Sequence, residues 1–546
     1  MSTTRRTHRR QRGTVLVLSM IFVLLFSALA VSMAGLSGTN VQVAANHHRV
    51  NVTLHAAQSG LDCAKYIVST ANFGQTNTNF VTPAQADQVW DTLCQHVQNL
   101  GLDGQSVPAA SQFTDGTGPG EEIVTPAMDY GSANTDFAVR FYRYDAEPYI
   151  IRTESVGTNG SLSRRITMSM DITKDREVLT YAIASRGRMW LTGDTTIHGD
   201  LYSSWDRADI SPFNMSSDSA VLGSINTVLE LDDIESHGWQ METLDANDNP
   251  IDVNGVELGT NYEERYYGPN DEIKAYHEGI NYSVPNDQQM PGMDISDYNT
   301  DGYNSGLTQI PSCPTGDQVT EYFPHAGGDY TAPKSSGSHQ YSRHVYEDQT
   351  FSNAILPYNR HALFKNCTFE DILYIDCYKS STRQSRSNNV RFENCTFNGT
   401  IITDVPQSFD WIDNCLYFTG AATFNNQSGI QEATILAPHF NVNLGNTNPE
   451  QNDNNVLTGA IVGGIVDVRG NAQIYGTIIS MYDTTGHSSG YVTNIGATLE
   501  DGGSETTELG DVGTIEITPE EDMMLPSGIT SPIIIKPNQE TYGECT

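Results

Sequence analysis

The longest hydrophobic pattern of the chain lies near its N-terminus. Residues 14–35 (TVLVLSMIFVLLFSALAVSMAG) contain no charged side chain, and roughly 20 apolar residues in a helix span the hydrocarbon core of a bilayer. Residues 36–70 contain no proline and carry apolar side chains at three- and four-residue steps, from Val41 to Ile67. This spacing places them on one helical face. The pattern therefore predicts one continuous helix over 14–70 whose first part crosses a membrane.

The residues in front of this helix set its orientation. Five arginines stand before Gly13, and the next basic residue is Arg49. Positive charge on one flank keeps the N-terminus in the cytoplasm and places the rest of the chain outside the cytoplasmic membrane. A cleavable signal peptide has the same basic start and apolar run. Its cleavage site would be Ala28-Leu29-Ala30, with a mature start at Val31, and this alternative stays open.

A short helix and three strands are predicted between the long helix and residue 175. Thr82 is a good N-cap, Pro83 suits the first helical turn, and Gly101 ends the helix. The strands are expected over 137–144, 149–155 and 163–172. A helix followed by an antiparallel meander gives a small α+β head. Cys63 and Cys94 are candidates for a disulfide, because an exported protein lies in an oxidising compartment, but the pairing stays open.

Residues 176–490 carry short strand patterns and internal repeats. The segment 191–203 aligns with 468–480, since both follow the pattern G-[DN]-x-x-I-x-G-x-[LI]-x-S. Short strands separated by glycine at fixed spacing are typical of a chain that turns the corners of a solenoid. Residues 205–340 are rich in Asp, Asn, Tyr and Pro. We expect them to form a loop-rich insertion in the β-domain.

Asn-Cys pairs form the second repeat. They occur at Asn366 and Cys367, at Asn394 and Cys395, and at Asn414 and Cys415. In a parallel β-helix, equivalent residues of successive coils stack about 4.8 Å apart. Asparagine tolerates the left-handed conformation at a corner, and cysteine fills the interior beside it. The repeats therefore predict a right-handed parallel β-helix, or β-solenoid, with these six residues as structural ladders.

Charge excludes one class of function. Asp and Glu number 66 against 29 Lys and Arg, which gives a formal net charge of −37. Binding of nucleic acid needs a positive field, so nucleic acid is excluded as a partner. Residues 500–522 hold nine acids and no basic residue. We expect 491–546 to be an acidic C-terminal segment outside the solenoid.

One oxygen-rich motif suggests a metal. Asp297, Asn299 and Asp301 stand at alternate positions before a glycine, and Tyr303 offers its backbone carbonyl. This is the first half of a calcium-binding loop. The twelfth position is Thr308 in place of the usual glutamate. Calcium is the one cofactor that the sequence suggests, with an ordinary Asx-rich turn as the alternative.

Carboxylates in the repeat region suggest an alternative function. Parallel β-helices also carry polysaccharide-cleaving enzymes, which use paired carboxylates and a basic residue. The candidates are Asp404, Asp410 and Asp413, with Arg383 and Arg386. Such clusters arise by chance in a chain with 66 acids. We expect no enzymatic activity and keep a membrane-tethered carbohydrate-active enzyme as the alternative.

The N-terminus resembles that of type IV pilin-like proteins, specifically the PilX-type minor pilins. The resemblance covers residues 5–70 and rests on Arg-Gln-Arg-Gly at 10–13, the aliphatic run from Thr14, and HAAQSGL at 55–61. It implies that a prepilin peptidase cleaves after Gly13 and leaves Thr14 as the new N-terminus. It also implies that the helix packs against other pilin-like subunits. The predicted α+β head is similar to pilin heads.

These patterns combine into one expected organisation and function. The predicted parts are a leader at 1–13, a transmembrane and extended helix at 14–70, a head at 71–175, a solenoid at 176–490 and an acidic segment at 491–546. The expected protein is a single-pass subunit of the bacterial cell envelope, with a structural or adhesive role in a type IV pilus or related machinery. The alternatives are the tethered enzyme and a secreted β-protein with a cleaved signal peptide.

Overall fold

The computed structural model of the chain divides into two units. The head contains residues 1–74, 81–173 and 533–546, and the β-domain contains residues 75–80 and 174–532. The structure describes residues 11–545 except for 193–194, 208–211, 216–218, 237–242, 245–249, 252–275, 285–289, 295–305, 314–316, 327–328, 378–387, 407–409, 411, 426–432, 446–454, 483–491, 497–513, 521–522, 524 and 526.

Helix α1 (Gln11–Thr70) is one unbroken element of 60 residues, as predicted. All side chains from Thr14 to Arg49 are exposed. The second half of the helix buries one face in the head, with Ala57, Leu61 and Ile67 among the buried side chains. By length and composition the helix can cross a membrane, since its most apolar window has a mean hydropathy of 2.7 and none of that window is buried.

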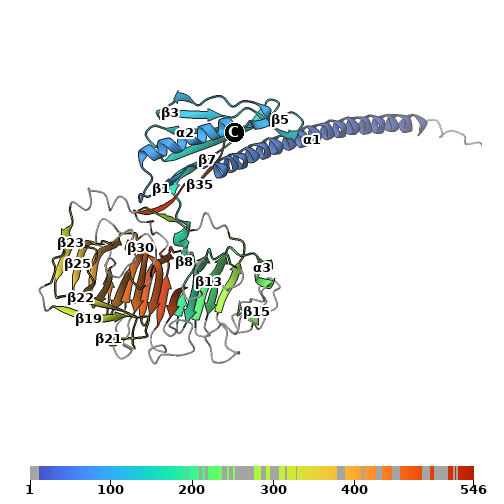
Figure 1. Ribbon diagram of the computed structural model, residues 1–546. Coiled ribbons are helices and arrows are strands. Elements are labelled where there is room, and N and C mark those ends of the chain that lie inside the picture. The colour runs from blue at the N-terminus through green and yellow to red at the C-terminus, as the bar shows by residue number, and fades with distance from the viewer. Residues whose placement is uncertain are drawn as a thin grey trace, which may run out of the picture. The chain divides into compact units, whose positions relative to one another are not determined.

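The head consists of α1, a second helix and an antiparallel sheet (Figure 1). Helix α2 (Pro83–Asn99) begins with a capping box between Thr82 and Gln85, which satisfies two backbone N–H groups at its start. The strands are β2 (Ser111–Thr114), β3 (Pro119–Val124), β4 (Met128–Ser132), β5 (Thr135–Tyr144), β6 (Ile150–Asn159), β7 (Leu162–Lys174) and β35 (Ile529–Cys545). Strands β5–β7 lie where the sequence predicts three strands. Trp90 and Leu93 of α2 pack with Phe141 in the core of the head.

Two glycines allow α1 to lie directly on the sheet. A Cβ atom at Gly157 of β6 would collide with the backbone of Thr53 and Ala57. A Cβ atom at Gly60 of α1 would collide with the Ser155 side chain. The absence of side chains at both positions therefore brings the helix backbone against β6. This contact attaches the buried half of α1 to the head.

Two cysteines of the head, Cys63 and Cys94, are not joined in the structure. Cys63 and Cys94 are both free thiols, so the disulfide considered between them is not formed. Both side chains lie in or against the same apolar core. Burial, with Glu121 nearby, raises the pKa of Cys94 to about 12. These thiols therefore behave as small hydrophobic side chains.

The C-terminal segment is not a separate acidic tail. Strand β35 pairs beside β7 in the sheet of the head, and Ile533 and Ile535 are buried in its core. Strands β33 (Val492–Gly496) and β34 (Ile515–Thr518) belong to the β-domain. The prediction of a separate acidic segment at 491–546 is wrong for these three strands. It relied on the acidic composition of 500–522 and gave too little weight to the short apolar alternations around it. The β-domain is therefore inserted between strand β7 of the head and its last strand, β35.

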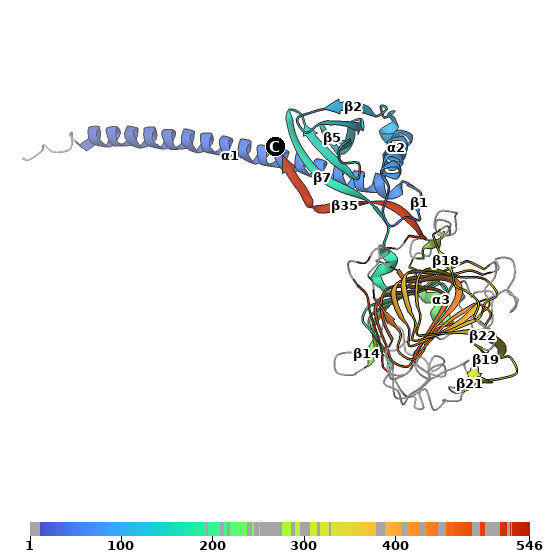
Figure 2. The same ribbon diagram turned by 90° about the vertical axis from the view of Figure 1, so that its left-hand side faces the viewer.

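The strands of the β-domain pair mostly in parallel. Strand β24 pairs with β26, β26 with β28, β25 with β27, and β30 with β31. The chain thus returns to the same position in successive layers, which surround a shared interior in Figure 2. The elements are β1 (Gln75–Thr76), β8 (Tyr181–Ser185), β9 (Arg188–Thr192), β10 (Thr195–Ile197), β11 (Asp200–Ser203), β12 (Phe213–Met215), β13 (Ser219–Thr227), α3 (Leu231–Ser236), β14 (Thr243–Leu244), β15 (Pro250–Ile251), β16 (Tyr276–Asn281), β17 (Gly292–Met293), β18 (Thr308–Gln309), β19 (Gln318–Phe323), β20 (His325–Ala326), β21 (Asp329–Pro333), β22 (His339–Glu347), β23 (Thr350–Leu356), β24 (Ala362–Lys365), β25 (Thr368–Ile375), β26 (Asn389–Glu393), β27 (Thr396–Thr403), β28 (Cys415–Thr419), β29 (Thr423–Phe424), β30 (Ala433–Gly445), β31 (Asn455–Arg469) and β32 (Ala472–Ser480).

The two ends of the β-domain meet in the middle of the stack. Strand β34 pairs with β10 on one side and with β32 on the other, and β8 lies between β11 and β32 in the same way. Ile183 therefore stands between Leu201 and Ile478. The two copies of the glycine-containing repeat occupy equivalent positions with one layer between them. Figure 1 shows β8 between β30 and β13.

Part of the predicted insertion at 205–340 belongs to the stack. Strand β12 pairs with β9, β13 pairs with β10 and β11, and β16 pairs with β13, all in parallel. Val221 and Ile225 are buried in the main core. The prediction of a loop-rich insertion is wrong for these strands, because so short an apolar alternation gives a weak local signal. Strands β19 and β22 form an antiparallel pair.

Two aromatic ladders fill part of the interior. The first contains Tyr346, Phe364, Phe392 and Phe418, and the second contains Phe351, Phe369, Phe397 and Phe424. Successive rings within a ladder have centroids 4.5 to 5.4 Å apart. Rings of different ladders meet edge to face. Since each aromatic pair is worth roughly 0.5–1.5 kcal/mol beyond its buried area, the ladders hold neighbouring layers in register.

Candidate functional sites

The exposed half of α1 is the first candidate site. Leu24 is 69% exposed and Phe26 is 66% exposed. No charged residue occurs from Thr14 to His48, and Arg49 then donates a hydrogen bond of 3.1 Å to Asn159 Oδ1 of the head. Water solvates such an apolar surface poorly, whereas lipid chains or other apolar helices cover it. The predicted processing residues Gly13 and Thr14 lie in the first turn of this helix.

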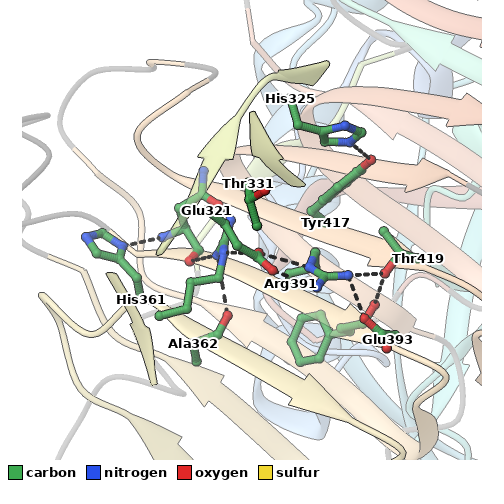
Figure 3. A network of polar contacts seen from close by, with 12 residues as sticks. Glu321, His325, Thr331, His361, Ala362, Arg391, Glu393, Tyr417 and Thr419 are labelled. Carbon is green, nitrogen blue, oxygen red and sulfur yellow. Dashed lines mark hydrogen bonds and ion pairs between the residues drawn. The ribbon is translucent and has the colours of Figure 1, made fainter. Parts of the chain in front are cut away.

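A charged cluster in the β-domain is the second candidate site (Figure 3). Arg391 binds the Glu321 carboxylate through Nη2 at 2.7 Å and Nε at 3.0 Å. Arg343 Nε lies 2.8 Å from the same carboxylate. All three side chains are at most 4% exposed. Two buried guanidinium groups therefore share one buried carboxylate.

Surrounding groups accept further hydrogen bonds from the two arginines. Arg343 Nη2 donates to Asn389 Oδ1 at 2.7 Å. Arg391 Nη1 donates to Glu393 Oε2 at 2.7 Å, and its guanidinium lies 3.8 Å from the centroid of the Tyr330 ring. With Glu393 included, the cluster has two positive and two negative side chains. It is therefore close to neutral, as a buried ionic group must be.

His325 lies beside this cluster on strand β20. Its Nε2 is 2.7 Å from the hydroxyl of Tyr417, and Figure 3 shows the imidazole directed at that hydroxyl. Its ring also packs against Tyr330, with centroids 4.5 Å apart. Burial, together with the nearby Arg391, lowers the pKa of His325 to about 4. The imidazole is therefore neutral at physiological pH.

The stability of the β-domain is expected to depend on pH through His325. Because its folded pKa of about 4 lies below its unfolded value of about 6.5, unfolding at acidic pH takes up a proton. The stabilisation is complete above about pH 6.5 and is lost as pH falls toward 4, by about 3 kcal/mol. We expect His325→Gln to lose less stability than the parent protein over this interval, measured by urea unfolding at each pH.

Two carboxyl groups make the parent protein a necessary comparison in that experiment. Burial, with the hydrogen bond to Asp404, raises the pKa of Asp376 to about 6. Burial, with Asp410 nearby, raises the pKa of Asp413 to about 6. Protonation of both groups therefore stabilises the fold as pH falls from about 6, opposite to His325. Equal pH dependence of His325→Gln and the parent would contradict the assignment to His325.

The Asn-Cys pairs divide between two positions of the layers. The residues on either side of the first two pairs share one register, with Phe364 opposite Phe392 and Thr368 opposite Thr396. Asn366 and Asn394 both have positive φ, at 51° and 54°. These two asparagines thus turn equivalent corners in neighbouring layers.

The third pair lies elsewhere. Cys415 is opposite Asn389 at the start of β26, and not opposite Cys395. The position equivalent to Asn394 in the next layer is Gly420, which has a φ of 67°. The placement of Asn414 and Cys415 in the same ladder is therefore wrong. The left-handed corner continues through a glycine, which sequence identity alone does not reveal.

The acids considered for catalysis fall into different contacts. Tyr374 donates a hydrogen bond of 2.9 Å to Asp404, which also bonds to Asp376. Asp413 Oδ1 lies 3.3 Å from His339 Nδ1 and is 5% exposed at its side chain. Arg383 and Arg386 lie outside the described residues. The structure therefore does not test whether these acids and arginines form the catalytic group considered in the sequence analysis.

The predicted calcium ligands also lie outside the described residues. They are Asp297, Asn299, Asp301 and Tyr303. Within the part of the chain that the structure describes, no group of three or more His, Cys, Asp or Glu side chains could hold a metal ion. The calcium site stays a prediction.

The sequence analysis missed the Glu321 cluster. Its members come from β19, β22 and β26, which are far apart in the chain and meet only through strand pairing. The one local signal lies in β22, where the buried Tyr341 and Arg343 alternate with the exposed Gln340 and Ser342. An alternation with an arginine at an inward position marks a buried charge that needs a partner.

Comparisons with known proteins give little further information. A scan against protein-family models gave no match, and a search of curated proteins gave none. Among solved structures, the chain is similar to the competence-associated pilin ComZ from Thermus thermophilus, at 14% identity. That match covers 91% of this chain and 98% of ComZ, with a TM-score of 0.28. A TM-score this low does not establish a shared fold and says nothing about the function of this chain.

Proposed function

We propose that this chain is a membrane-anchored, pilin-like subunit of the bacterial cell envelope. The carrying observation is that one helix has two halves of different character. Residues 14–49 are exposed, and most are apolar, whereas residues beyond Thr53 form part of the core of the head. A helix that begins in lipid and ends in a folded head anchors the protein and offers a surface for packing against other subunits.

The orientation follows from the flanking charges. The basic residues before Gly13 keep the N-terminus in the cytoplasm, and the head and β-domain lie outside the cytoplasmic membrane. We propose that a prepilin peptidase removes residues 1–13 and that the chain is a minor subunit of the PilX type. The resemblance of residues 5–70 to that family supports both statements.

The β-domain is proposed to be the part that is displayed. Parallel pairing between successive layers and the stacked aromatic ladders support a right-handed parallel β-helix. Its role would be structural or adhesive, without enzymatic activity. Because β35 returns to the sheet of the head, the β-domain is attached by chain segments at both of its ends. Such a double attachment suits a module that transmits force between a ligand and an anchored helix.

Processing of the N-terminus tests the proposal. N-terminal sequencing of protein purified from membranes is expected to give Thr14, and Gly13→Val is expected to retain the leader. The matched control is Ala30→Val, which blocks a signal-peptidase site and is expected to leave processing at Thr14 unchanged. A mature start at Val31 would support the secreted alternative, and an uncleaved chain would leave a plain anchor.

A further inference from the structure

Cys313 and His344 form a pair of chemically reactive side chains in the β-domain. Cys313 Sγ lies 3.0 Å from His344 Nδ1. Both residues are partly buried, so neither is closed off in the core. His344 belongs to β22, and Cys313 lies 31 residues earlier in the chain. A thiol and an imidazole at this distance are the two parts of an activated sulfur nucleophile.

Three hydrogen bonds from Tyr346 and Arg360 hold the segment that carries Cys313. Tyr346 donates a hydrogen bond of 2.6 Å to the carbonyl of Pro311. Arg360 donates to Ser312 Oγ at 3.0 Å and to the carbonyl of Ile310. The position of the sulfur relative to the imidazole is therefore fixed by several contacts from β22 and the turn before β24.

The hydrogen bonds define the resting protonation state. The backbone N–H of Cys313 points at His344 Nδ1 at 3.3 Å, and since a backbone N–H only donates, this nitrogen carries a lone pair. Burial, together with Arg360, lowers the pKa of His344, which keeps the imidazole neutral. Cys313 Sγ is also 3.0 Å from the carbonyl oxygen of Asp317, which accepts a hydrogen bond from the S–H group. The site thus holds a thiol beside a neutral base.

The second nitrogen of the imidazole also has a neighbour. Gln318 Nε2 lies 3.5 Å from His344 Nε2, and Ser342 Oγ lies 2.9 Å from Gln318 Oε1. The oxygen and the nitrogen of a glutamine amide are assigned from the hydrogen-bond network, and the amide can be turned so that they exchange places. With the amide oxygen toward His344, the imidazole N–H gains an acceptor, and the amide nitrogen donates to Ser342. Gln318 is therefore a positioning residue for the imidazole.

Among the other free cysteines that the structure describes, Cys63 is half-buried and the rest are buried, namely Cys94, Cys367, Cys377, Cys395 and Cys415. Burial raises the pKa of Cys63 and of Cys94. Cys415 is fully buried, and burial raises its pKa well above the usual range. A thiol whose pKa is raised by apolar surroundings is inert as a nucleophile. Reactivity at Cys313 would thus stand out from that of these three thiols.

We propose that Cys313 and His344 form a thiol–disulfide exchange site that binds a disulfide-bearing molecule covalently. As Cys313 Sγ attacks one sulfur of the disulfide, its proton moves to His344 Nδ1. The S–S bond of the incoming molecule breaks, a mixed disulfide forms, and the departing thiolate takes the proton from the imidazolium. Atoms and electrons balance without an added oxidant. The inference rests on the proposed function only for the oxidising location that supplies disulfides.

The test uses the full-length protein in detergent and the neutral disulfide dithiodipyridine as the probe. Mass mapping after a short reaction is expected to find the label on Cys313, and Cys313→Ser is expected to abolish this fast phase. His344→Gln keeps an acceptor for the Cys313 N–H but has no base. We expect the rate of this variant at Cys313 to be about tenfold lower than that of the parent protein near pH 7. This is a modest effect for the loss of a general base.

The pH profile separates a base from a mere packing partner. The rate of the parent protein is expected to fall when His344 becomes protonated at acidic pH, whereas His344→Gln lacks this step. If His344→Gln does not fold, Gln318→Ala gives the second comparison, with a smaller loss of rate. Unchanged rates in both variants, or labelling at Cys63 in place of Cys313, would overturn the proposal. The assay needs no membrane, so its outcome is independent of N-terminal processing.

Discussion

Glu321→Gln is expected to lower the free energy of unfolding of the β-domain by about 3–5 kcal/mol, because it leaves two buried guanidinium groups without their shared carboxylate. The glutamine side chain fills the same volume, so no cavity contributes. Arg343 keeps two neutral partners, Asn389 and the carbonyl of Ala362, whereas Arg391 keeps the carboxylate of Glu393. Urea unfolding of the full-length protein, followed by near-ultraviolet circular dichroism, measures the difference.

Glu393→Gln is the matched control for this experiment. Glu393 also binds Arg391 at 2.7 Å, but its side chain is 30% exposed. Because Glu393 is partly solvated and Arg391 keeps its bond to Glu321, this variant is expected to lose less stability than Glu321→Gln. Equal losses in the two variants would show that burial of the Glu321 carboxylate has no special weight. A loss in Glu321→Gln of under about 1 kcal/mol would do the same.

The elements predicted best are those whose signals are local. Helix α2 begins at Pro83 because Thr82 and Gln85 form its capping box, and both residues stand within four positions. Helix α1 continues from its apolar half into its buried half without a proline to interrupt it. Such signals depend only on residues that are close in the sequence, so the sequence alone is sufficient to predict these helices.

The elements predicted worst depend on pairing across long distances. Strand β35 lies beside β7, which ends at Lys174, more than 350 residues earlier in the chain. The meeting of β34 with β10 likewise joins the end of the β-domain to its beginning. The aligned repeat at 191–203 and 468–480 contained this information, because equivalent sequences occupy equivalent layer positions. The repeat did not show that the layer between its two copies combines β8, from the start of the β-domain, with β34, from its end.

The candidate sites follow the same division. The exposed half of α1 is visible in the sequence, because 22 residues from Thr14 to Gly35 lack a charge. The Glu321 cluster is not visible, since strand register brings its members together. The pair of Cys313 and His344 is not visible either, since hydrogen bonds from Tyr346 and Arg360 place the segment of Cys313 beside β22. Asn414 shows the reverse error, in which a repeated dipeptide stands at a different register from its copies.

Leu25→Asp is expected to release the protein from the membrane. A carboxylate at the centre of a membrane helix costs about 2.5–3.5 kcal/mol, and the loss of leucine adds a few tenths. This corresponds to about a 100-fold shift in the insertion equilibrium. Leu25 is 61% exposed and makes no contact with the core of the head, so the fold outside the membrane is expected to stay intact. Resistance to carbonate extraction measures the membrane-bound fraction.

Val43→Asp is the control on the same helix. Val43 is 47% exposed and lies beyond the 22-residue uncharged apolar run. A charge there meets water or headgroups, so this variant is expected to stay in the membrane fraction like the parent protein. If Leu25→Asp also resists carbonate, the apolar half of α1 is not the anchor and must be covered by protein alone. If both variants are released, the hydrophobic span extends further along α1 than the uncharged run indicates, and the head must begin closer to the bilayer.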